Sequence, residues 1–176
     1  MIFRPLEIPG IFAVEAEMQT DERGLFARTW SAGQFRANGL NPALVEMSVS
    51  HNPKAGTLRG LHYQTAPHEE AKLVRCTRGA IFDVAVDLRP SSPTFKRYAA
   101  LQLTEENRTA LYVPEGCAHG FLTLVGGSEL LYLISHAYVP THATGVRWND
   151  PAFGIEWPAV PSLMSERDRN YPDFVE

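Results

Sequence analysis

Three short segments of the chain hold most of the residues that could do chemistry. Residues 56–64 read GTLRGLHYQ, residues 72–79 read KLVRCTRG, and residues 114–121 read PEGCAHGF. An imidazole titrates close to neutral pH, so His62 is suited to act as a general base. Lys72 is one of only three lysines in the chain, and a protonated lysine accepts no metal bond and repels a divalent ion. A histidine base next to a fixed positive charge indicates proton-transfer chemistry.

The spacing within these segments resembles the two conserved boxes of the cupin superfamily, whose members are small barrels built from two β-sheets. In the first box a glycine stands six residues before a histidine, as Gly56 stands before His62. The box also has a glutamate seven residues before a second glycine, and here Lys72 occupies that position before Gly79. The second box, P-x-G-x-x-H, matches residues 114–119.

The residues at the metal-binding positions of this frame argue against a metal centre. A cupin metal site uses two histidines and the glutamate of the first box, together with the histidine of the second. This chain has Gln64 and Lys72 at two of those positions, which leaves His62 and His119 as the only good ligands. We therefore expect no metal and no other cofactor, which disfavours a metal-dependent cupin oxygenase.

Glycine and proline divide the sequence into many short segments that alternate as β-strands do. The 13 glycines and 13 prolines are spread along the chain, as in all-β sandwiches and barrels. In residues 79–88 four apolar residues alternate with Asp83 and Asp87, which predicts a strand with one apolar face. Residues 43–50 alternate in the same way. Further strands are predicted over residues 26–30, 111–113, 121–125 and 129–138.

Two short helices and an irregular segment complete the predicted architecture. Ser31 is a good N-cap for a helix that ends near Gly39, and Ser165-x-x-Asp168 has the spacing of a capping box. Residues 150–161 contain three prolines and a glycine, which is typical of an ordered but irregular segment. The sequence thus predicts an all-β fold, a cupin-type double-stranded β-helix or jelly roll with short peripheral helices.

Length, charge and cysteine content limit the class of protein. We expect one domain over residues 1–176, in which an extension from about residue 150 to 176 packs on the barrel. The formal charge of −4 comes from interspersed acidic and basic residues, which argues against a nucleic-acid groove. The longest apolar run, Leu130–Ile134, is too short for a membrane helix, and the N-terminus has no signal-peptide pattern. Cys76 and Cys117 suggest no disulfide framework, so we expect a cytoplasmic protein with no nucleic-acid or membrane partner.

From about residue 21 to residue 168 the sequence resembles the dTDP-4-dehydrorhamnose 3,5-epimerase family. The most specific motif is R-G-L-H-Y-Q at residues 59–64, followed by K-L-V at residues 72–74. Further matches are DVAVDLR at 83–89, SPTF at 92–95, PEGCAHGF at 114–121, WNDP at 148–151 and WP at 157–158. Members of this family invert C3 and C5 of a nucleotide-linked 4-keto-6-deoxyhexose, whose ketone acidifies the hydrogens on both neighbouring carbons.

The resemblance implies roles for individual residues. The four expected catalytic residues are the base His62, its acidic partner Asp168, the cation Lys72 beside the C4 oxygen, and Tyr132, which supplies a proton from the opposite ring face. Substrate contacts are implied at Arg23, Phe26, Glu46, Ser48, Arg59, Gln64, His119 and Tyr138. The resemblance also implies a homodimer in which the N-terminal strands around Phe26 join the neighbouring sheet, so that Arg23 or Phe26 reaches into the neighbour's site.

Several positions depart from the family pattern near the expected nucleotide site. The usual Q-x-N-x-S run is here Glu46-Met-Ser48-Val-Ser50, and F-x-E is Phe26-Ala-Arg28. A carboxylate at Glu46 could accept a hydrogen bond from an exocyclic amine, which leaves cytosine or guanine open beside thymine.

The main prediction is a metal-independent 3,5-epimerase of a nucleoside-diphosphate 4-keto-6-deoxyhexose in activated deoxysugar biosynthesis. One alternative is a C3-only epimerase or a ketoisomerase on a CDP- or GDP-linked sugar, which would share the base and differ in the acid. Another is a non-catalytic cupin that binds a sugar nucleotide. Retention of His62, Asp168 and Lys72 disfavours this last alternative.

Overall fold

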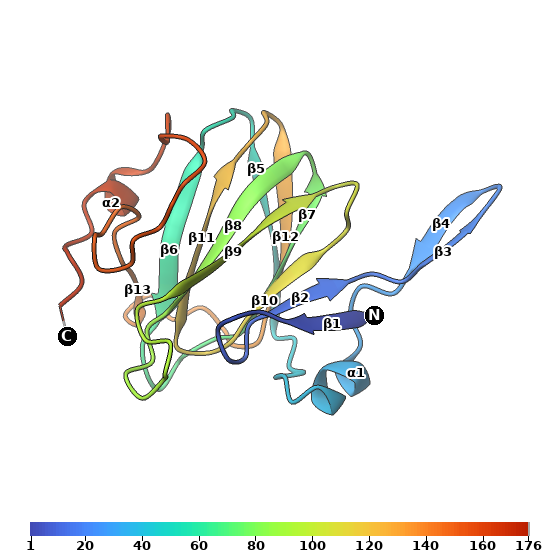
Figure 1. Cartoon of the computed structure of the whole chain (residues 1–176), viewed down its shortest axis with the longest axis horizontal. Coiled ribbons are helices and arrows are strands. Elements are labelled where there is room, and N and C mark those ends of the chain that lie inside the picture. The colour runs from blue at the N-terminus through green and yellow to red at the C-terminus, as the bar shows by residue number, and fades with distance from the viewer. Residues whose placement is uncertain (176) are drawn as a thin grey trace.

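Two antiparallel β-sheets face each other in the computed structural model, which describes residues 1–175 (Figure 1). The larger sheet of this described chain has the strand order β1-β2-β10-β7-β12-β5. Its strands span Ile2–Pro5 (β1), Phe12–Glu15 (β2), Ala110–Val113 (β10), Lys72–Arg78 (β7), Ser128–Ile134 (β12) and Glu46–Asn52 (β5). The smaller sheet has the order β13-β6-β11-β8-β9. Its strands span Ala143–Gly145 (β13), Leu58–Gln64 (β6), Cys117–Thr123 (β11), Ala80–Asp87 (β8) and Tyr98–Thr104 (β9).

Neighbouring strands within each sheet are mostly distant in the sequence. β7 lies between β10 and β12, and β11 lies between β6 and β8. The chain therefore passes repeatedly from one sheet to the other, as it does in a jelly roll. This topology confirms the predicted all-β, cupin-type fold.

A hairpin and two helices lie outside the sheets. The hairpin consists of β3 (Met18–Asp21) and β4 (Gly24–Ala27) and projects away from the barrel (Figure 1). The helices are α1 (Ala32–Ala37) and α2 (Glu166–Arg169). Among residues 1–175 no helix is long and apolar enough to cross a membrane.

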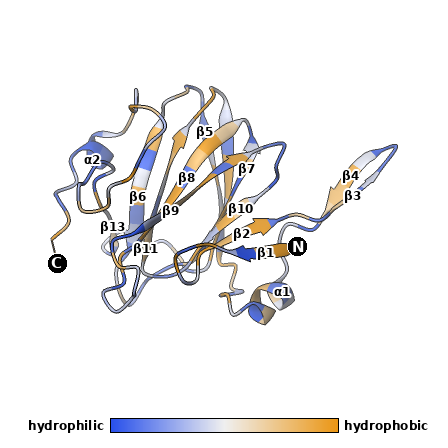
Figure 2. Ribbon diagram, viewed as in Figure 1, coloured by the Kyte–Doolittle hydropathy of each residue, from blue (hydrophilic) through white to orange (hydrophobic). Residues whose placement is uncertain are grey.

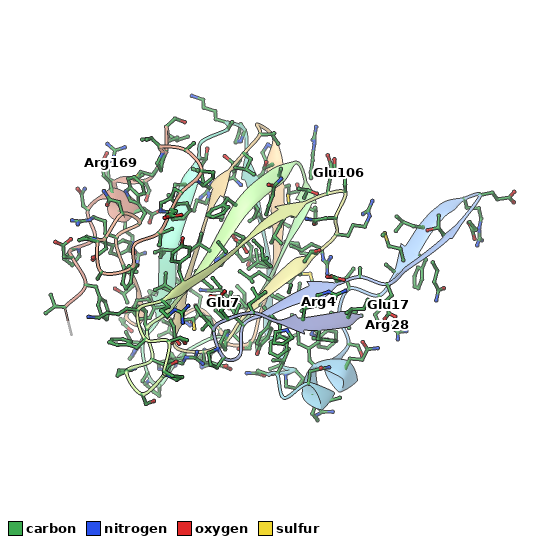
Figure 3. All side chains as sticks on the ribbon, in the orientation of Figure 1. Arg4, Glu7, Glu17, Arg28, Glu106 and Arg169 are labelled. Atoms are coloured by element: carbon green, nitrogen blue, oxygen red, sulfur yellow. The ribbon has the colours of Figure 1, made fainter. Side chains whose placement is uncertain are left out.

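Apolar side chains fill the space between the two sheets. Val74 and Leu130 of the larger sheet and Ile81, Ala85 and Phe121 of the smaller sheet belong to one fully buried cluster. Figure 2 shows that the sheet strands carry most of the hydrophobic colour, while the loops are more hydrophilic. The charged side chains labelled in Figure 3, which include Arg4 and Glu106, lie at the periphery of the fold. Each fully buried aliphatic or aromatic side chain stabilises the fold by roughly 1.5–3 kcal/mol.

β8 is buried on both faces, which corrects the prediction of one apolar face. Asp83 lies on the inner face together with Ala85 of the core, because side chains two residues apart share a face. Val84 and Val86 lie on the outer face, in one cluster with Phe153 of the C-terminal extension. The extension therefore covers the apolar side of β8, and the polar side is turned inward.

β5 also has its polar side turned inward. The strand begins at Glu46 rather than at residue 43. Met47 and Val49 are 58% and 62% exposed on the outside of the sheet, whereas Glu46 and Ser48 line a cavity inside the barrel. The predicted alternation is present, but the polar side of the strand faces the cavity.

The remaining predicted elements are present with shifted ends. The strand predicted over residues 26–30 corresponds to β4, which ends at Ala27, and the one predicted over residues 129–138 ends at Ile134. Ser31 precedes α1, but within the described chain its side chain makes no capping hydrogen bond. Ser165 does cap α2, since its hydroxyl accepts a hydrogen bond from the Asp168 N–H at 3.0 Å. The C-terminal extension is described up to residue 175, and residue 176 lies outside the described residues.

Asp87 anchors the turn that follows β8. Its buried carboxylate accepts hydrogen bonds from Arg89 Nε at 2.7 Å, the Ser92 hydroxyl at 2.5 Å and the Thr94 hydroxyl at 2.7 Å. Burial by itself would raise the pKa of Asp87, but these donors outweigh burial and lower the pKa to about 2. The DVAVDLR and SPTF motifs are therefore held together by this carboxylate.

Replacing Asp87 by asparagine should destabilise the protein by roughly 1–3 kcal/mol, because the buried donors lose a charged acceptor. The unfolded aspartate has an ordinary pKa of about 3.9. The contribution of Asp87 should thus be present above about pH 4 and disappear as the pH falls toward the folded pKa of about 2. Urea denaturation of the wild type and of Asp87→Asn across this pH range measures both effects.

Asp21→Asn is the matched control for that experiment. Asp21 and Arg23 form the same D-x-R fork as Asp87 and Arg89, but their side chains are 51% and 84% exposed. Solvent screens this exposed pair, so the control should unfold like the wild type. Equal destabilisation of the two variants would contradict the role of Asp87.

Candidate active site

A cavity of about 460 Å³ opens between the two sheets. Its walls come from the inward-facing side chains of β5, β6, β7, β11 and β12 and from the loop after β12. Nine of the predicted site residues line it: Glu46, Ser48, Arg59, His62, Gln64, Lys72, His119, Tyr132 and Tyr138. Strand register explains this convergence, because Tyr132 pairs with Ser48 on one side and Val74 on the other, and His62 pairs with His119.

His62 and Asp168 form the closest polar contact of the site. His62 Nε2 lies 2.6 Å from Asp168 Oδ1, although 106 residues separate them. The other carboxylate oxygen accepts a hydrogen bond from the Gly60 N–H at 3.3 Å. The aspartate is buried, whereas the imidazole is 43% exposed to the cavity. Asp168 therefore holds the imidazole at Nε2, while part of the ring remains accessible from the cavity.

Several groups keep the carboxylate of Asp168 charged. Burial by itself would raise its pKa, but the hydrogen bond and charge of His62, together with the Gly60 N–H, hold the pKa below its usual value. A charged carboxylate behind an imidazole orients the ring and stabilises the imidazolium that forms when the ring takes up a proton. The pair is thus arranged as a general base with an orienting acid.

Two glycines allow β6 and β11 to approach closely next to this pair. A Cβ atom at Gly60 would lie 2.6 Å from the Cα of Gly120, and Gly60 has a φ of +114°. Only glycine fits such contact and such a backbone angle without strain. The close approach brings His119 of β11 next to His62 of β6.

A second histidine–aspartate pair lies deeper in the barrel. His119 Nε2 lies 2.7 Å from Asp83 Oδ1, and both residues are buried. Burial raises the pKa of Asp83, although the charge and hydrogen bond of His119 act in the opposite direction. Asp83 therefore contacts His119 inside the barrel. From the sequence, Asp83 was predicted only to lie in a strand.

Tyr132 faces this second pair from the opposite sheet. Its ring packs edge-on against His119, with ring centroids 5.9 Å apart. Burial, followed by the charge of Asp83, raises the pKa of Tyr132 well above its ordinary value. The phenol therefore keeps its proton at neutral pH, and its side chain lines the cavity.

Lys72 enters the cavity at the beginning of β7. Its ammonium group donates a hydrogen bond to the main-chain oxygen of His62 at 3.1 Å and forms an ion pair with Glu70 at 2.8 Å. Only 11% of the Lys72 side chain is exposed. The structure therefore places a fixed cation beside the histidine base, as the sequence indicates.

Gln64 organises the loop that follows β12. Its amide nitrogen donates to the main-chain oxygens of His68 and Ala137, at 2.9 and 3.2 Å, and its amide oxygen accepts from the Val139 N–H at 2.6 Å. Three of its hydrogen-bonding positions are therefore occupied by main-chain groups. Gln64, which occupies the position of the second cupin histidine, thus has a structural role in holding these loops. Contact between its amide and the substrate stays a prediction.

Two other predicted contacts shape the rim of the cavity. Glu46 Oε1 accepts a hydrogen bond from the Tyr138 N–H at 3.1 Å, which connects β5 to the loop carrying this tyrosine. Arg59 Nε donates to the Asn52 side chain at 2.8 Å. Tyr138 is 58% exposed, so its ring is available to a ligand at the mouth.

Arg23 and Phe26 stand apart from this group. Both belong to the projecting β3–β4 hairpin, where Arg23 pairs with Asp21 and Phe26 is 69% exposed. Neither lines the cavity of its own chain within residues 1–175. Their predicted role therefore depends on a second subunit.

The structure adds cavity residues that sequence reasoning missed: Glu70, Phe121, His136 and Arg167. Glu70 and Phe121 lie close to recognised motifs, and strand alternation from Lys72 and His119 could have placed them inside. His136 and His142 both pack against His68, with ring centroids 5.2 and 4.4 Å apart. These three histidines are half-buried and form a cluster, of which His136 lines the cavity.

The donor groups of the cavity do not suit a metal ion. His62 and His119 both direct Nε2 at a carboxylate, Gln64 is engaged by the main chain, and Lys72 brings a positive charge. Within residues 1–175 no cluster of three or more histidine, cysteine, aspartate or glutamate side chains could hold an ion.

Comparison with known proteins connects this geometry to one family. Residues 5–176 match the family model described as dTDP-4-dehydrorhamnose 3,5-epimerase. The protein of that name from Sinorhizobium fredii is 40% identical over 177 residues, which cover 100% of this chain and 91% of the relative.

Solved structures agree with the sequence comparison. The Bacillus anthracis dTDP-4-dehydrorhamnose 3,5-epimerase, solved with TDP and PPi bound, superposes with a TM-score of 0.94 at 36% identity, covering 98% of this chain and 99% of that one. ChmJ of Streptomyces bikiniensis, described as a 3'-monoepimerase in complex with dTDP-quinovose, gives a TM-score of 0.89 at 36% identity and covers 96% and 86%.

The donor set predicts that the purified protein contains no stoichiometric metal. Elemental analysis of protein prepared without a chelating tag should find iron, zinc and manganese well below one atom per chain. Treatment with a chelator should leave the melting temperature unchanged, because no ligand set would lose its ion. Stoichiometric metal whose removal lowers the melting temperature would overturn this prediction.

Proposed function

The chain belongs to the dTDP-4-dehydrorhamnose 3,5-epimerase family, and on that basis we propose that it inverts C3 and C5 of a nucleoside-diphosphate 4-keto-6-deoxyhexose in activated deoxysugar biosynthesis. The carrying observation is the arrangement of His62 and Tyr132 on facing sheets, with Lys72 between the sheets at the same cavity. The whole chain acts as a single catalytic domain.

The geometry supports a two-stage proton exchange at each carbon. The ketone at C4 acidifies the hydrogens on C3 and C5, and His62 removes one of them while Asp168 stabilises the resulting imidazolium. The electron pair of the broken C–H bond moves into the ring, and the C4 oxygen becomes an enolate beside the Lys72 ammonium. Tyr132 then returns a proton to the opposite face of the same carbon. The configuration inverts, and no oxidant or reductant is needed.

The nucleotide is proposed to be a thymidine diphosphate. The solved relatives from Bacillus anthracis and Streptomyces bikiniensis hold TDP and dTDP-quinovose. Glu46 departs from the family pattern, and its carboxylate could have recognised the exocyclic amine of cytosine or guanine. In the structure, one of its carboxylate oxygens accepts a hydrogen bond from the Tyr138 N–H. Because this hydrogen bond holds the loop at the cavity rim, the presence of a carboxylate at position 46 is explained without a contact to the nucleotide base.

The proposed function predicts solvent deuterium incorporation at both C3 and C5 of dTDP-4-keto-6-deoxyglucose. CDP-, GDP- and UDP-linked sugars should exchange more slowly. Exchange at C3 alone would instead indicate a single inversion, as the description of the Streptomyces bikiniensis relative suggests for that protein. Binding without exchange at either carbon would identify a non-catalytic sugar-nucleotide protein.

His62→Ala should abolish exchange at both carbons, because His62 is the base of the proposed mechanism and the other aspartate-paired imidazole of the cavity, His119, is buried. Asp168→Asn should lower turnover by roughly 10²–10⁴-fold with little effect on binding. The double variant should lose no more than His62→Ala alone, since the two residues act as a unit. Multiplicative losses would show that Asp168 only caps α2, and near wild-type exchange in His62→Ala would remove His62 from the mechanism.

We further propose that the active form is a homodimer in the cytoplasm. β5 is the edge strand of the larger sheet, and its outer face exposes Met47 and Val49. The projecting hairpin exposes Leu25 and Phe26. An exposed apolar edge is an aggregation hazard unless another strand covers it. A second copy would cover it and bring Arg23 and Phe26 toward the neighbour's cavity. Free, buried Cys76 and Cys117 suit a reducing compartment.

Met47→Glu should convert the dimer into a monomer at micromolar concentration, because a charge would be buried at the interface. Light scattering measures the mass, and the exchange assay should show a loss of activity in parallel. Val160→Glu is the matched control, because Val160 is 85% exposed outside β5 and the hairpin. A fully active wild-type monomer would refute the dimer, as would a Met47→Glu protein that remains dimeric.

A further inference from the structure

Glu70 is a buried carboxylate whose identified partner is Lys72. The residue is 8% exposed and lies two positions before Lys72. Its Oε1 is 2.8 Å from Lys72 Nζ. Its Oε2 is also buried and has no hydrogen-bond partner within residues 1–175. A buried charge is costly unless it is paired, and the ion pair with Lys72 is the contact that compensates this one.

The two contacts of Lys72 leave one of its three N–H groups for the cavity. A lysine ammonium has three donors and no acceptor. One is directed at the main-chain oxygen of His62 and one at Glu70. Because these acceptors come from different segments, they fix the ammonium in two directions. The remaining N–H can only point away from both of them.

The segment that carries Glu70 is held at both ends. Ala71 donates its N–H to the Ser135 hydroxyl at 2.8 Å, and its main-chain oxygen accepts the Ser135 N–H at 3.0 Å. At the other end, Gln64 donates to the main-chain oxygen of His68. The position of the Glu70 carboxylate is therefore set by the barrel and not by Lys72 alone.

The other ionisable groups that face Lys72 across the cavity have different partners. Glu46 of β5 accepts from the Tyr138 N–H, His62 of β6 contacts Asp168, and His119 of β11 contacts Asp83. Tyr132 of β12 completes the wall. Among the described residues, Glu70 is the carboxylate in contact with the ammonium.

We propose that Glu70 is a positioning residue, which holds the Lys72 ammonium so that its free N–H is directed at the C4 oxygen of the substrate. This inference rests on the proposed function. The carboxylate at 2.8 Å and the main-chain oxygen of His62 at 3.1 Å hold the ammonium from two sides. Glu70 thus acts through Lys72 and needs no contact with the substrate.

Glu70→Gln tests the proposal, because it keeps the size and an acceptor oxygen while it removes the charge. The variant should lower kcat by roughly 10–100-fold, the scale of a misdirected catalytic group, and leave KM nearly unchanged. Glu69→Gln makes the same charge change one residue away, outside the cavity lining, and should behave as the wild type.

A double variant separates positioning from a general structural effect. If Glu70 acts through Lys72, then Glu70→Gln should cause no further loss in a Lys72→Ala background. An equal loss in both backgrounds would overturn the proposal, and so would a Glu70→Gln enzyme with wild-type kcat. In either case the wild type would still exchange deuterium, so the proposed function would stand.

A spectroscopic readout is independent of turnover. The chain has only three lysines, at positions 54, 72 and 96, so their side-chain carbon signals can be assigned by single substitutions. The Lys72 signal should shift in Glu70→Gln relative to the wild type, because the carboxylate 2.8 Å from the ammonium is lost, while the signals of the other two lysines stay unchanged. An unchanged Lys72 signal would overturn the proposal even if no substrate were turned over.

Discussion

Charges inside this barrel must be paired, and that constraint shapes the whole site. Taking a carboxylate or an ammonium out of water is expensive unless an opposite charge and hydrogen bonds replace the solvent. The cavity accordingly contains three close pairs, Asp168 with His62, Asp83 with His119, and Glu70 with Lys72. In each pair the acid is buried, and its histidine or lysine partner lines the cavity. The contacts with these buried acids hold the two histidines and the lysine in fixed orientations at the cavity.

The inward polar faces require the outward faces to be covered. β8 can turn Asp83 inward because Val84 and Val86 on its other side pack under the C-terminal extension. The same extension carries α2 and hence Asp168. One segment therefore both covers the outer apolar surface and supplies the orienting acid, which couples the integrity of the fold to the geometry of the base. β5 has the same inside-out pattern, but within one chain its outer face remains exposed, and this is the surface that the proposed dimer would bury.

The catalytic and the nucleotide-binding parts of the site are built differently. The groups assigned to proton transfer lie on strands, where register and close packing at Gly60 and Gly120 position them tightly. The rim, with Tyr138 and the loop held by Gln64, consists of connections that hydrogen bonds hold in place. Of the departures from the family pattern, Glu46 holds the rim through the Tyr138 N–H, whereas Arg28 directly follows the projecting β3–β4 hairpin and does not line the cavity of its own chain within residues 1–175. Under the proposed function, a change at Glu46 would affect the rim and leave the groups assigned to proton transfer in place.

Local motifs, through the family that they resemble, predicted the reaction class and nine residues of the cavity. The R-G-L-H-Y-Q motif, the K-L-V motif and the second cupin box each lie within one short segment, so each can be recognised without knowledge of the fold. Within a strand, residues two positions apart lie on the same face. This is why His62, Lys72 and His119 could be identified and why the all-β fold followed from alternation. Which face of an alternating strand is buried is not a local property, because it depends on what covers the other side. Only the tertiary structure therefore showed that Asp83 and Glu46 point inward, and that Glu70 is paired with Lys72. The contact between His62 and Asp168 is another such case, since sequence separation says nothing about distance once the chain has folded.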